Sequence, residues 1–276
     1  MRGVDFAGGR PGAKAIKAAG FDFVVRYLTD GGPGLPGKLL LPAEMDDYKA
    51  NNVAVCFMWE TSADRAKAGR QAGFDDALKA DNYLISIGLA SQIIYFAVDF
   101  DATEVDQTSI NEYLAGAGQY LGIWRVGVYG GYWPISRAAE AGVVAWVEQT
   151  QAWSGDNLWP SRNITQQIGQ ITINGIPCDV LEAHTVDFGQ FPPPSGERSD
   201  VDFSTQWPNK YHDVVDNTAA PMLSIGDQIS YAQTWAAEAN NNVKQLRLDL
   251  PSILADALKN VTVQVTIQGV GVEAKS

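Results

Sequence analysis

The chain has 276 residues, of which 46% are hydrophobic, so it can bury one large domain core and carry a small appendage. Its formal net charge of -12 argues against nucleic acid or an anionic membrane surface as the main partner. No apolar run reaches the roughly 18–20 residues that a membrane span needs. The first residues lack the charged and apolar blocks of a signal peptide, so we expect synthesis in the cytoplasm.

Apolar runs alternate with helical stretches along the first 190 residues. The predicted strands cover residues 3–7, 21–27, 53–59, 93–101, 125–130, 143–153 with a loop, 164–169 and 177–180. The predicted helices cover residues 13–19, 42–51, 63–88, 109–121 and 135–141. This alternation is typical of parallel βαβ units, and eight units predict an α/β fold, a (β/α)₈ TIM-like barrel. About 250 residues is the usual size, so some helices should be short or missing. An open doubly wound sheet is the alternative, although no glycine fingerprint follows the first strand.

A proline-rich composition break after residue 190 separates the predicted barrel from the rest of the chain. We expect a barrel over 1–190, an irregular linker over 191–222, and a C-terminal helix and strand over 223–276. Apolar residues alternate with polar ones from 261 to 267, which is typical of a strand with one buried face. Such a strand either assembles with copies of itself or folds back on the barrel. We expect the first, a homo-oligomer formed through 223–276.

Acidic residues stand at the ends of four predicted strands. They are Asp5, Glu60, the pair Asp99 and Asp101, and Asp179. The active site of such a barrel lies at the C-terminal ends of its strands, so these side chains should meet at one mouth. Crowded carboxylates repel, and at least one should keep its proton while another stays ionised. That division is what acid–base cleavage of a glycosidic bond requires.

Additional side chains near the strand ends could bind a substrate. Tyr129, Tyr132 and Trp153 offer aromatic faces to the apolar faces of sugars. Arg26, at the end of the second strand, could orient a carboxylate or bind an acidic substituent, and Asp179 is placed with these binding residues. The two histidines and two cysteines lack metal-ligand spacing, so we expect no metal and no cofactor.

A purely structural role is also open to each acid except Asp99. Asp101 precedes Ala102-Thr103-Glu104, so it could cap the next helix through an Asp-x-x-Glu box. Glu60 could support a helix start or pair with Arg65. Asp5 could pair with Arg26 across neighbouring strands, and Asp179 could be a turn residue.

Three short motifs resemble a known group of proteins. Gly3-Val4-Asp5-Phe6, Phe96-Ala97-Val98-Asp99-Phe100-Asp101 and Tyr129-Gly130-Gly131-Tyr132 look like the glycoside-hydrolase-like domain of actinobacterial secreted proteins and actinophage lysins. The segment from Gly175 to Val180 also resembles the last-strand motif of those lysins. The group is similar to the family 25 lysozymes, which cleave the glycan of peptidoglycan on a (β/α)-barrel.

The resemblance implies roles for individual residues. Asp99 and Asp101 stand where the lysozymes carry an Asp-x-Glu pair whose second acid donates the proton. Asp5 and Asp179 match the aspartates of their first and last strands. The second acid here is an aspartate, shorter by one methylene, and Glu60 could supply the missing reach.

The function implied is a peptidoglycan glycan-strand hydrolase, a muramidase-like endolysin that uses carboxylate acid–base chemistry. It would act at the bacterial cell wall, after release in phage lysis or as part of a virion. The alternative is a non-catalytic barrel that binds glycan or cell wall, in a virion or a wall-associated protein.

Overall fold

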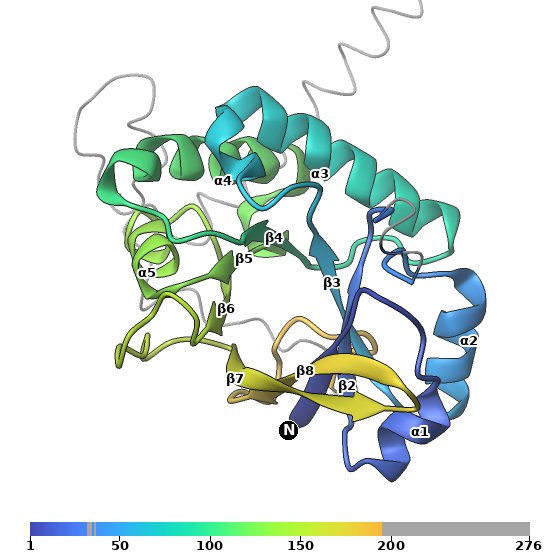
Figure 1. Ribbon diagram of the computed structural model, residues 1–276. Helices are drawn as coiled ribbons and strands as arrows, with labels where there is room; N and C mark the ends of the chain where they lie inside the picture. The colour runs from blue at the N-terminus through green and yellow to red at the C-terminus, as the bar shows by residue number, and fades with distance from the viewer. Residues whose placement is uncertain (32–34, 36, 195–276) are drawn as a thin grey trace, which may run out of the picture. The chain divides into compact units, whose positions relative to one another are not determined.

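Eight β-strands form a closed barrel in which neighbours pair in sequence order (Figure 1). The structure, a computed structural model, describes residues 1–31, 35 and 37–194. The strands are β1 (Arg2–Asp5), β2 (Phe23–Tyr27), β3 (Ala54–Trp59), β4 (Ile94–Val98), β5 (Val126–Gly130), β6 (Trp146–Thr150), β7 (Ile164–Ile173) and β8 (Ile176–Ala183). The prediction of a TIM-like α/β barrel is confirmed. The predicted tail over 223–276 and most of the predicted linker over 191–222 lie outside the described residues.

The described residues contain five α-helices, one after each of the first five strands. They are α1 (Ala13–Ala18), α2 (Pro42–Ala50), α3 (Gly69–Ser86), α4 (Gln107–Leu121) and α5 (Tyr132–Glu140), with 3₁₀ turns η2 (Arg65–Ala68), η3 (Glu104–Asp106) and η4 (Ile123–Arg125). No described helix links β6 to β7 or β7 to β8, which agrees with the expectation of missing helices. Within the described ranges, no helix combines the length and apolar character that crossing a membrane requires.

The last two strands depart from the predicted parallel arrangement. β7 and β8 form an antiparallel hairpin, and β8 also runs antiparallel to β1. Asn174 and Gly175 make the turn, with φ angles of 49° and 79°. An Asn-Gly pair with positive φ at both residues is the preferred connection of a two-residue hairpin. The prediction of eight parallel units is therefore wrong here, because a two-residue turn cannot return the chain to a parallel strand.

Apolar side chains fill two separate layers, one between strands and helices and one inside the barrel. Inward residues alternate with outward ones, so Phe23 and Val25 belong to the inner layer while Val24 packs outside. Phe188, in the segment after β8, closes the end of the barrel where β2 and β4 begin. Its ring lies 4.7 Å from that of Phe23, and its carbonyl accepts a hydrogen bond of 2.7 Å from the Tyr95 hydroxyl.

The helices α3 and α4, side by side in Figure 1, approach closely through two glycines. A Cβ atom on Gly73 would lie 1.8 Å from the Tyr113 carbonyl oxygen, and one on Gly116 would lie 2.0 Å from that of Arg70. Across the same contact the Tyr113 hydroxyl donates a hydrogen bond of 2.9 Å to Asp76 Oδ2. The two backbones can pack at this distance only because these positions carry no side chain.

We expect Gly116→Ala to lower the free energy of unfolding by about 1–3 kcal/mol, because the added methyl group would force the two helices apart. Gly118→Ala in the same helix is the matched control, since its nearest neighbouring atom would be 3.8 Å away. Alanine there should be neutral or stabilise the helix by roughly 0.5–1 kcal/mol. Urea unfolding of both variants measures the difference, and equal losses would contradict the role of Gly116.

Candidate active site

A cavity of about 140 Å³ lies at the end of the barrel where β1 to β5 finish. At roughly 30 Å³ per molecule it has room for four or five waters. Four of the five predicted acids meet in its wall. The lining residues are Asp5, Tyr27, Met58, Glu60, Ala97, Asp99, Tyr129, Gln166 and Asp179. The positions of the acids at the strand ends predict that they meet at one mouth of the barrel. Four of the five acids do so.

Strand alternation brings two of these acids to the cavity. Ala97 of β4 faces inward, and Asp99 follows it by two residues. Met58 of β3 faces inward in the same way and Glu60 follows it. Each acid stands just beyond the last residues of its strand, where the side chain still keeps the alternation of the strand.

Asp101 does not reach the cavity, although it was expected on the same face as Asp99. β4 ends at Val98 and the chain then bends away, so the alternation stops, and Asp101 is exposed. The expected capping role of Asp101 is also corrected. The next turn, η3, has Thr103 rather than Asp101 as its N-cap residue, and the Thr103 backbone N–H donates a hydrogen bond of 2.9 Å to Asp106 Oδ2.

Asp5 is a buried acid that keeps its proton. It is 4% exposed and accepts hydrogen bonds from the Tyr27 hydroxyl at 3.2 Å and from Gln166 Nε2 at 3.0 Å. Burial, followed by the negative charge of Asp179, raises the pKa of Asp5 to about 8, while the two hydrogen bonds act in the opposite direction. Asp5 is therefore mostly uncharged at pH 7. The expectation of an Asp5–Arg26 pair is wrong, because Arg26 has different partners.

Asp99 and Glu60 form a second pair of carboxyl groups. Burial, followed by the charge of Glu60, raises the pKa of Asp99 to about 6, whereas Lys38 and the Tyr129 hydroxyl lower it. Glu60 Oε2 lies 2.9 Å from Lys38 Nζ. Arg65, which the sequence offered as a partner for Glu60, pairs with an aspartate of α3 instead. In this pair, Asp99 holds a proton below about pH 6 and Glu60 has Lys38 as its counter-ion.

Asp179 lies in the middle of β8, whereas it was expected at a strand end or in a turn. Because β8 runs antiparallel to β1, Asp179 is the direct cross-strand neighbour of Asp5. Its side chain is partly buried, and burial raises its pKa, which a hydrogen bond with Gln170 partly offsets. The antiparallel direction of β8 therefore determines the position of Asp179 in the site.

Sequence reasoning misses a further acid inside the barrel. Glu148 of β6 is 0% exposed, and within the described residues neither of its carboxyl oxygens has a hydrogen-bond partner. Burial, followed by the charge of Asp5, raises the pKa of Glu148 well above its ordinary value. The available signal was its position two residues after Trp146, a residue that packs against the inner layer.

Three more residues of the site also escape the sequence analysis. Tyr27 and Gln166 line the cavity, and Lys38 contacts the lining residue Glu60. Tyr27 could have been found, since it continues the inward positions of Phe23 and Val25 on β2. Lys38 lies in a loop and Gln166 lies in the strand that begins the hairpin. No periodic pattern marks either of them.

Of the three aromatic candidates, one lines the cavity and two do not. Tyr129 lines the cavity, and its hydroxyl donates a hydrogen bond of 2.6 Å to Gln166 Oε1. Tyr132 begins α5 and packs edge-on against Trp133, with ring centres 5.0 Å apart. Trp153, in the loop after β6, is 40% exposed. Tyr132 and Trp153 do not line the cavity and would meet only a ligand that extends beyond it.

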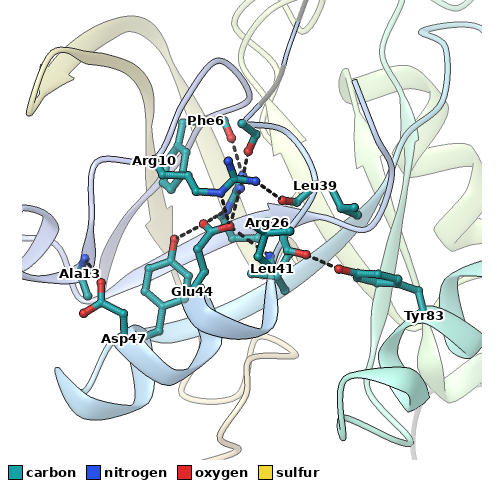
Figure 2. A network of polar contacts seen from close by, with 12 residues as sticks. Phe6, Arg10, Ala13, Arg26, Leu39, Leu41, Glu44, Asp47 and Tyr83 are labelled. Carbon is teal, nitrogen blue, oxygen red and sulfur yellow. Dashed lines mark hydrogen bonds and ion pairs between the residues drawn. The ribbon is translucent and has the colours of Figure 1, made fainter. Parts of the chain in front are cut away.

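Figure 2 shows that Arg26 lies in a polar network outside the barrel, which corrects its expected position at the substrate. The side chain is fully buried, and alternation on β2 places it opposite to the inward Tyr27. Its guanidinium donates hydrogen bonds to the Phe6 carbonyl at 2.6 Å, to the Gly37 carbonyl at 2.7 Å and to Glu44 Oε1 at 3.1 Å. Arg26 therefore holds loops and α2 together.

Glu44 of α2 is the acceptor at the centre of this network (Figure 2). Besides Arg26, its carboxylate accepts hydrogen bonds from Arg10 Nε at 2.8 Å, from the Tyr48 hydroxyl at 3.0 Å and from the Leu41 backbone N–H at 3.1 Å. Two guanidinium groups thus share one largely buried carboxylate. The loops after β1 and β2 are joined to α2 through it.

A family of known sequences matches residues 14–180, which extend from α1 into β8. Its description is "Rv2525c-like, glycoside hydrolase-like domain". The chain belongs to this family. The resemblance to a glycoside-hydrolase-like domain is therefore confirmed.

Individual members and structures agree with this Rv2525c-like assignment. Over 199 residues the chain is 26% identical to "Putative peptidoglycan hydrolase Rv2525c" of Mycobacterium tuberculosis, which covers 68% of this chain and 82% of that protein. A crystal structure of the Tat-secreted protein Rv2525c of M. tuberculosis with L-tartrate is 25% identical, covers 68% of this chain and 98% of the other, and superposes with a TM-score of 0.65. A B. stearothermophilus protein, 17% identical over 67% of this chain and 96% of its own, has a TM-score of 0.50 and shows the fold alone.

We expect Asp5→Asn to make the stability of the protein less dependent on pH. The pKa of Asp5 is about 8 in the folded chain and roughly 3.9 when unfolded, so only the unfolded state loses this proton between pH 4 and 8. The native protein should therefore lose stability as pH rises through this range, by at most about 1.4 kcal/mol per pH unit from this group. Urea unfolding from pH 5 to 8 should show a shallower decline for Asp5→Asn than for the control Asp46→Asn, an exposed acid of α2.

We expect Arg26→Met to lower the free energy of unfolding by about 3–5 kcal/mol, because it leaves a largely buried carboxylate with fewer partners. Lys17→Met is the control, since the Lys17–Asp22 pair is 38% and 50% exposed and should contribute less than about 1 kcal/mol. Thermal and urea unfolding would measure both. A loss for Arg26→Met no larger than the control would contradict the structural role of Arg26.

Proposed function

We propose that this protein hydrolyses the glycan strands of peptidoglycan, as a muramidase of the lysozyme type. The observation that carries the proposal is the Asp99–Glu60 pair at the barrel mouth. Asp99, with its pKa raised to about 6, holds a proton under mildly acidic conditions, and Glu60 is paired with Lys38 at 2.9 Å. A proton donor and a carboxylate side by side are the groups that glycosidic cleavage requires.

The chemistry assigns one step to each group. Asp99 donates its proton to the glycosidic oxygen as the bond to the anomeric carbon breaks, and the leaving sugar departs as an alcohol. The carboxylate of Glu60 stabilises the positive charge that develops on the sugar ring. Water then adds to the anomeric carbon and returns a proton to Asp99. We assign proton donation to Asp99 rather than Asp101, because Asp101 is exposed and does not line the cavity.

The family and its members support the substrate class. The matched family is described as glycoside hydrolase-like, and the M. tuberculosis relative carries peptidoglycan hydrolase in its name. The strand-end motifs resemble those of actinophage lysins, and this resemblance supports the more specific proposal of an endolysin of the family 25 type. We extend the proposal to the bacterial cell wall as the place of action, after release in phage lysis or on a virion. Assembly through 223–276 stays a prediction from the sequence pattern.

One observation favours the second candidate, a barrel that binds glycan without cleaving it. The cavity of about 140 Å³ is smaller than the roughly 300 Å³ at which ligand pockets begin. A sugar ring would therefore extend beyond the cavity. Binding without cleavage is the outcome that separates the two candidates.

We expect the native protein to release new reducing ends from purified actinobacterial cell walls, and Asp99→Asn to release them at least about 100-fold more slowly. Mass spectrometry of the products identifies the bond that is cut. The rate of the native protein should fall above about pH 6, because Asp99 then loses the proton that it donates. Sedimentation with the walls should show that the variant still binds.

Asp46→Asn, which changes an exposed acid of α2, is the matched control and should retain the native rate. Binding of the native protein to walls without any release of reducing ends would contradict the hydrolase and favour the binding barrel. Equal rates for Asp99→Asn and the native protein would remove Asp99 from the proposed chemistry.

A further inference from the structure

Lys38 is a buried cation at the edge of the acidic cavity. The residue is 5% exposed, and its Nζ atom lies 2.9 Å from Glu60 Oε2. The same ammonium group lies 4.9 Å from the centre of the Tyr27 ring. Glu60 and Tyr27 both line the cavity. A buried ammonium requires such partners, and here they are a carboxylate and an aromatic face of the candidate active site.

The backbone on both sides of Lys38 is held by the network of Figure 2. Arg26 Nη2 donates a hydrogen bond of 2.7 Å to the carbonyl of Gly37. Arg10 Nη2 donates one of 2.7 Å to the carbonyl of Leu39. Both guanidinium groups also bind the same carboxylate of α2, that of Glu44. Two arginines that do not line the cavity thus hold the peptides on both sides of Lys38, whose ammonium group contacts Glu60.

We propose that Lys38 is a positioning residue that keeps Glu60 as a carboxylate beside Asp99, so that Asp99 carries the proton of the pair. The inference deepens the proposed function and rests on it for its catalytic meaning. Without a cation, two adjacent carboxyl groups compete for one proton, because both cannot ionise at close range without a cost. The ammonium group of Lys38 contacts Glu60, which decides the competition in favour of a charged Glu60.

Among the residues that the structure describes, the other titratable groups near the pair do not supply this positive charge. They are acids and phenols, namely Asp5 of β1, Tyr27 of β2, Tyr129 of β5, Glu148 of β6 and Asp179 of β8. Burial keeps Asp5 largely protonated at neutral pH and raises the pKa of Glu148. The effect of Lys38 on the pair is therefore opposite in sign to that of every ionised neighbour in this set.

The test is a carboxyl-carbon NMR titration of Asp99 and Glu60 in the full chain, with each signal assigned by its absence in Asp99→Asn or Glu60→Gln. Asp99 of the native protein should titrate at about pH 6. Lys38→Met should move the Glu60 midpoint upward by about one pKa unit, because Glu60 loses its counter-ion and then competes with Asp99 for the proton. Lys38→Arg keeps the charge and should restore most of the native midpoint.

Lys17→Met, which removes an exposed lysine, is the control and should leave the Asp99 and Glu60 midpoints unchanged. Lys38→Gln is the second neutral variant if Lys38→Met does not fold. An unchanged Glu60 midpoint in the neutral variants would overturn the proposal, and so would an equal shift in Lys38→Arg. The titration needs no turnover, so a native protein that cleaves no glycan would defeat the proposed function and leave this inference to be decided by the midpoint alone.

Discussion

Burial of carboxyl groups inside a closed barrel is the constraint on which the candidate site depends. Side chains on the inward face of β1, β4 and β6 meet apolar neighbours and one another, so a carboxyl group there ionises with difficulty. Burial is the largest cause of the raised pKa of Asp5, Asp99 and Glu148 alike. The acids then differ in their surroundings. Asp99 is only partly buried and lies near a lysine, whereas Glu148 has no hydrogen-bond partner within the described residues.

One turn of two residues determines the composition of the cavity wall. Asn174 and Gly175 reverse the chain, so that β8 returns beside β1 in the opposite direction. Asp179 is thereby placed across from Asp5, and its charge contributes to the proton affinity of Asp5. Gln166, on the first arm of the hairpin, donates a hydrogen bond to Asp5 and accepts one from Tyr129. A parallel eighth strand would have presented Asp179 at a different height.

The polar network around Glu44 explains how a charged residue outside the barrel can matter to the interior. Arg26 and Arg10 are held by Glu44 and in turn hold the peptides beside Lys38. Each contact replaces water around a buried charge, so the cost of burial is met by hydrogen bonds to loops rather than to ligand. The loops at the mouth are consequently tied to α2, and the position of Lys38 follows from that connection.

The sequence by itself determined the barrel and part of its mouth. Apolar runs of strand length and their spacing predict the eight strands, and alternation from Ala97 and Met58 predicts that Asp99 and Glu60 face inward. Only the tertiary structure decided the rest. The position of Asp101 depends on the residue at which β4 ends. The position of Arg26 depends on which face of β2 meets α2. The position of Lys38 depends on a loop whose peptides are held by arginines distant in the sequence. The protonation of each acid depends on burial and on neighbours far away in the chain, and neither quantity is encoded in a local pattern of residues.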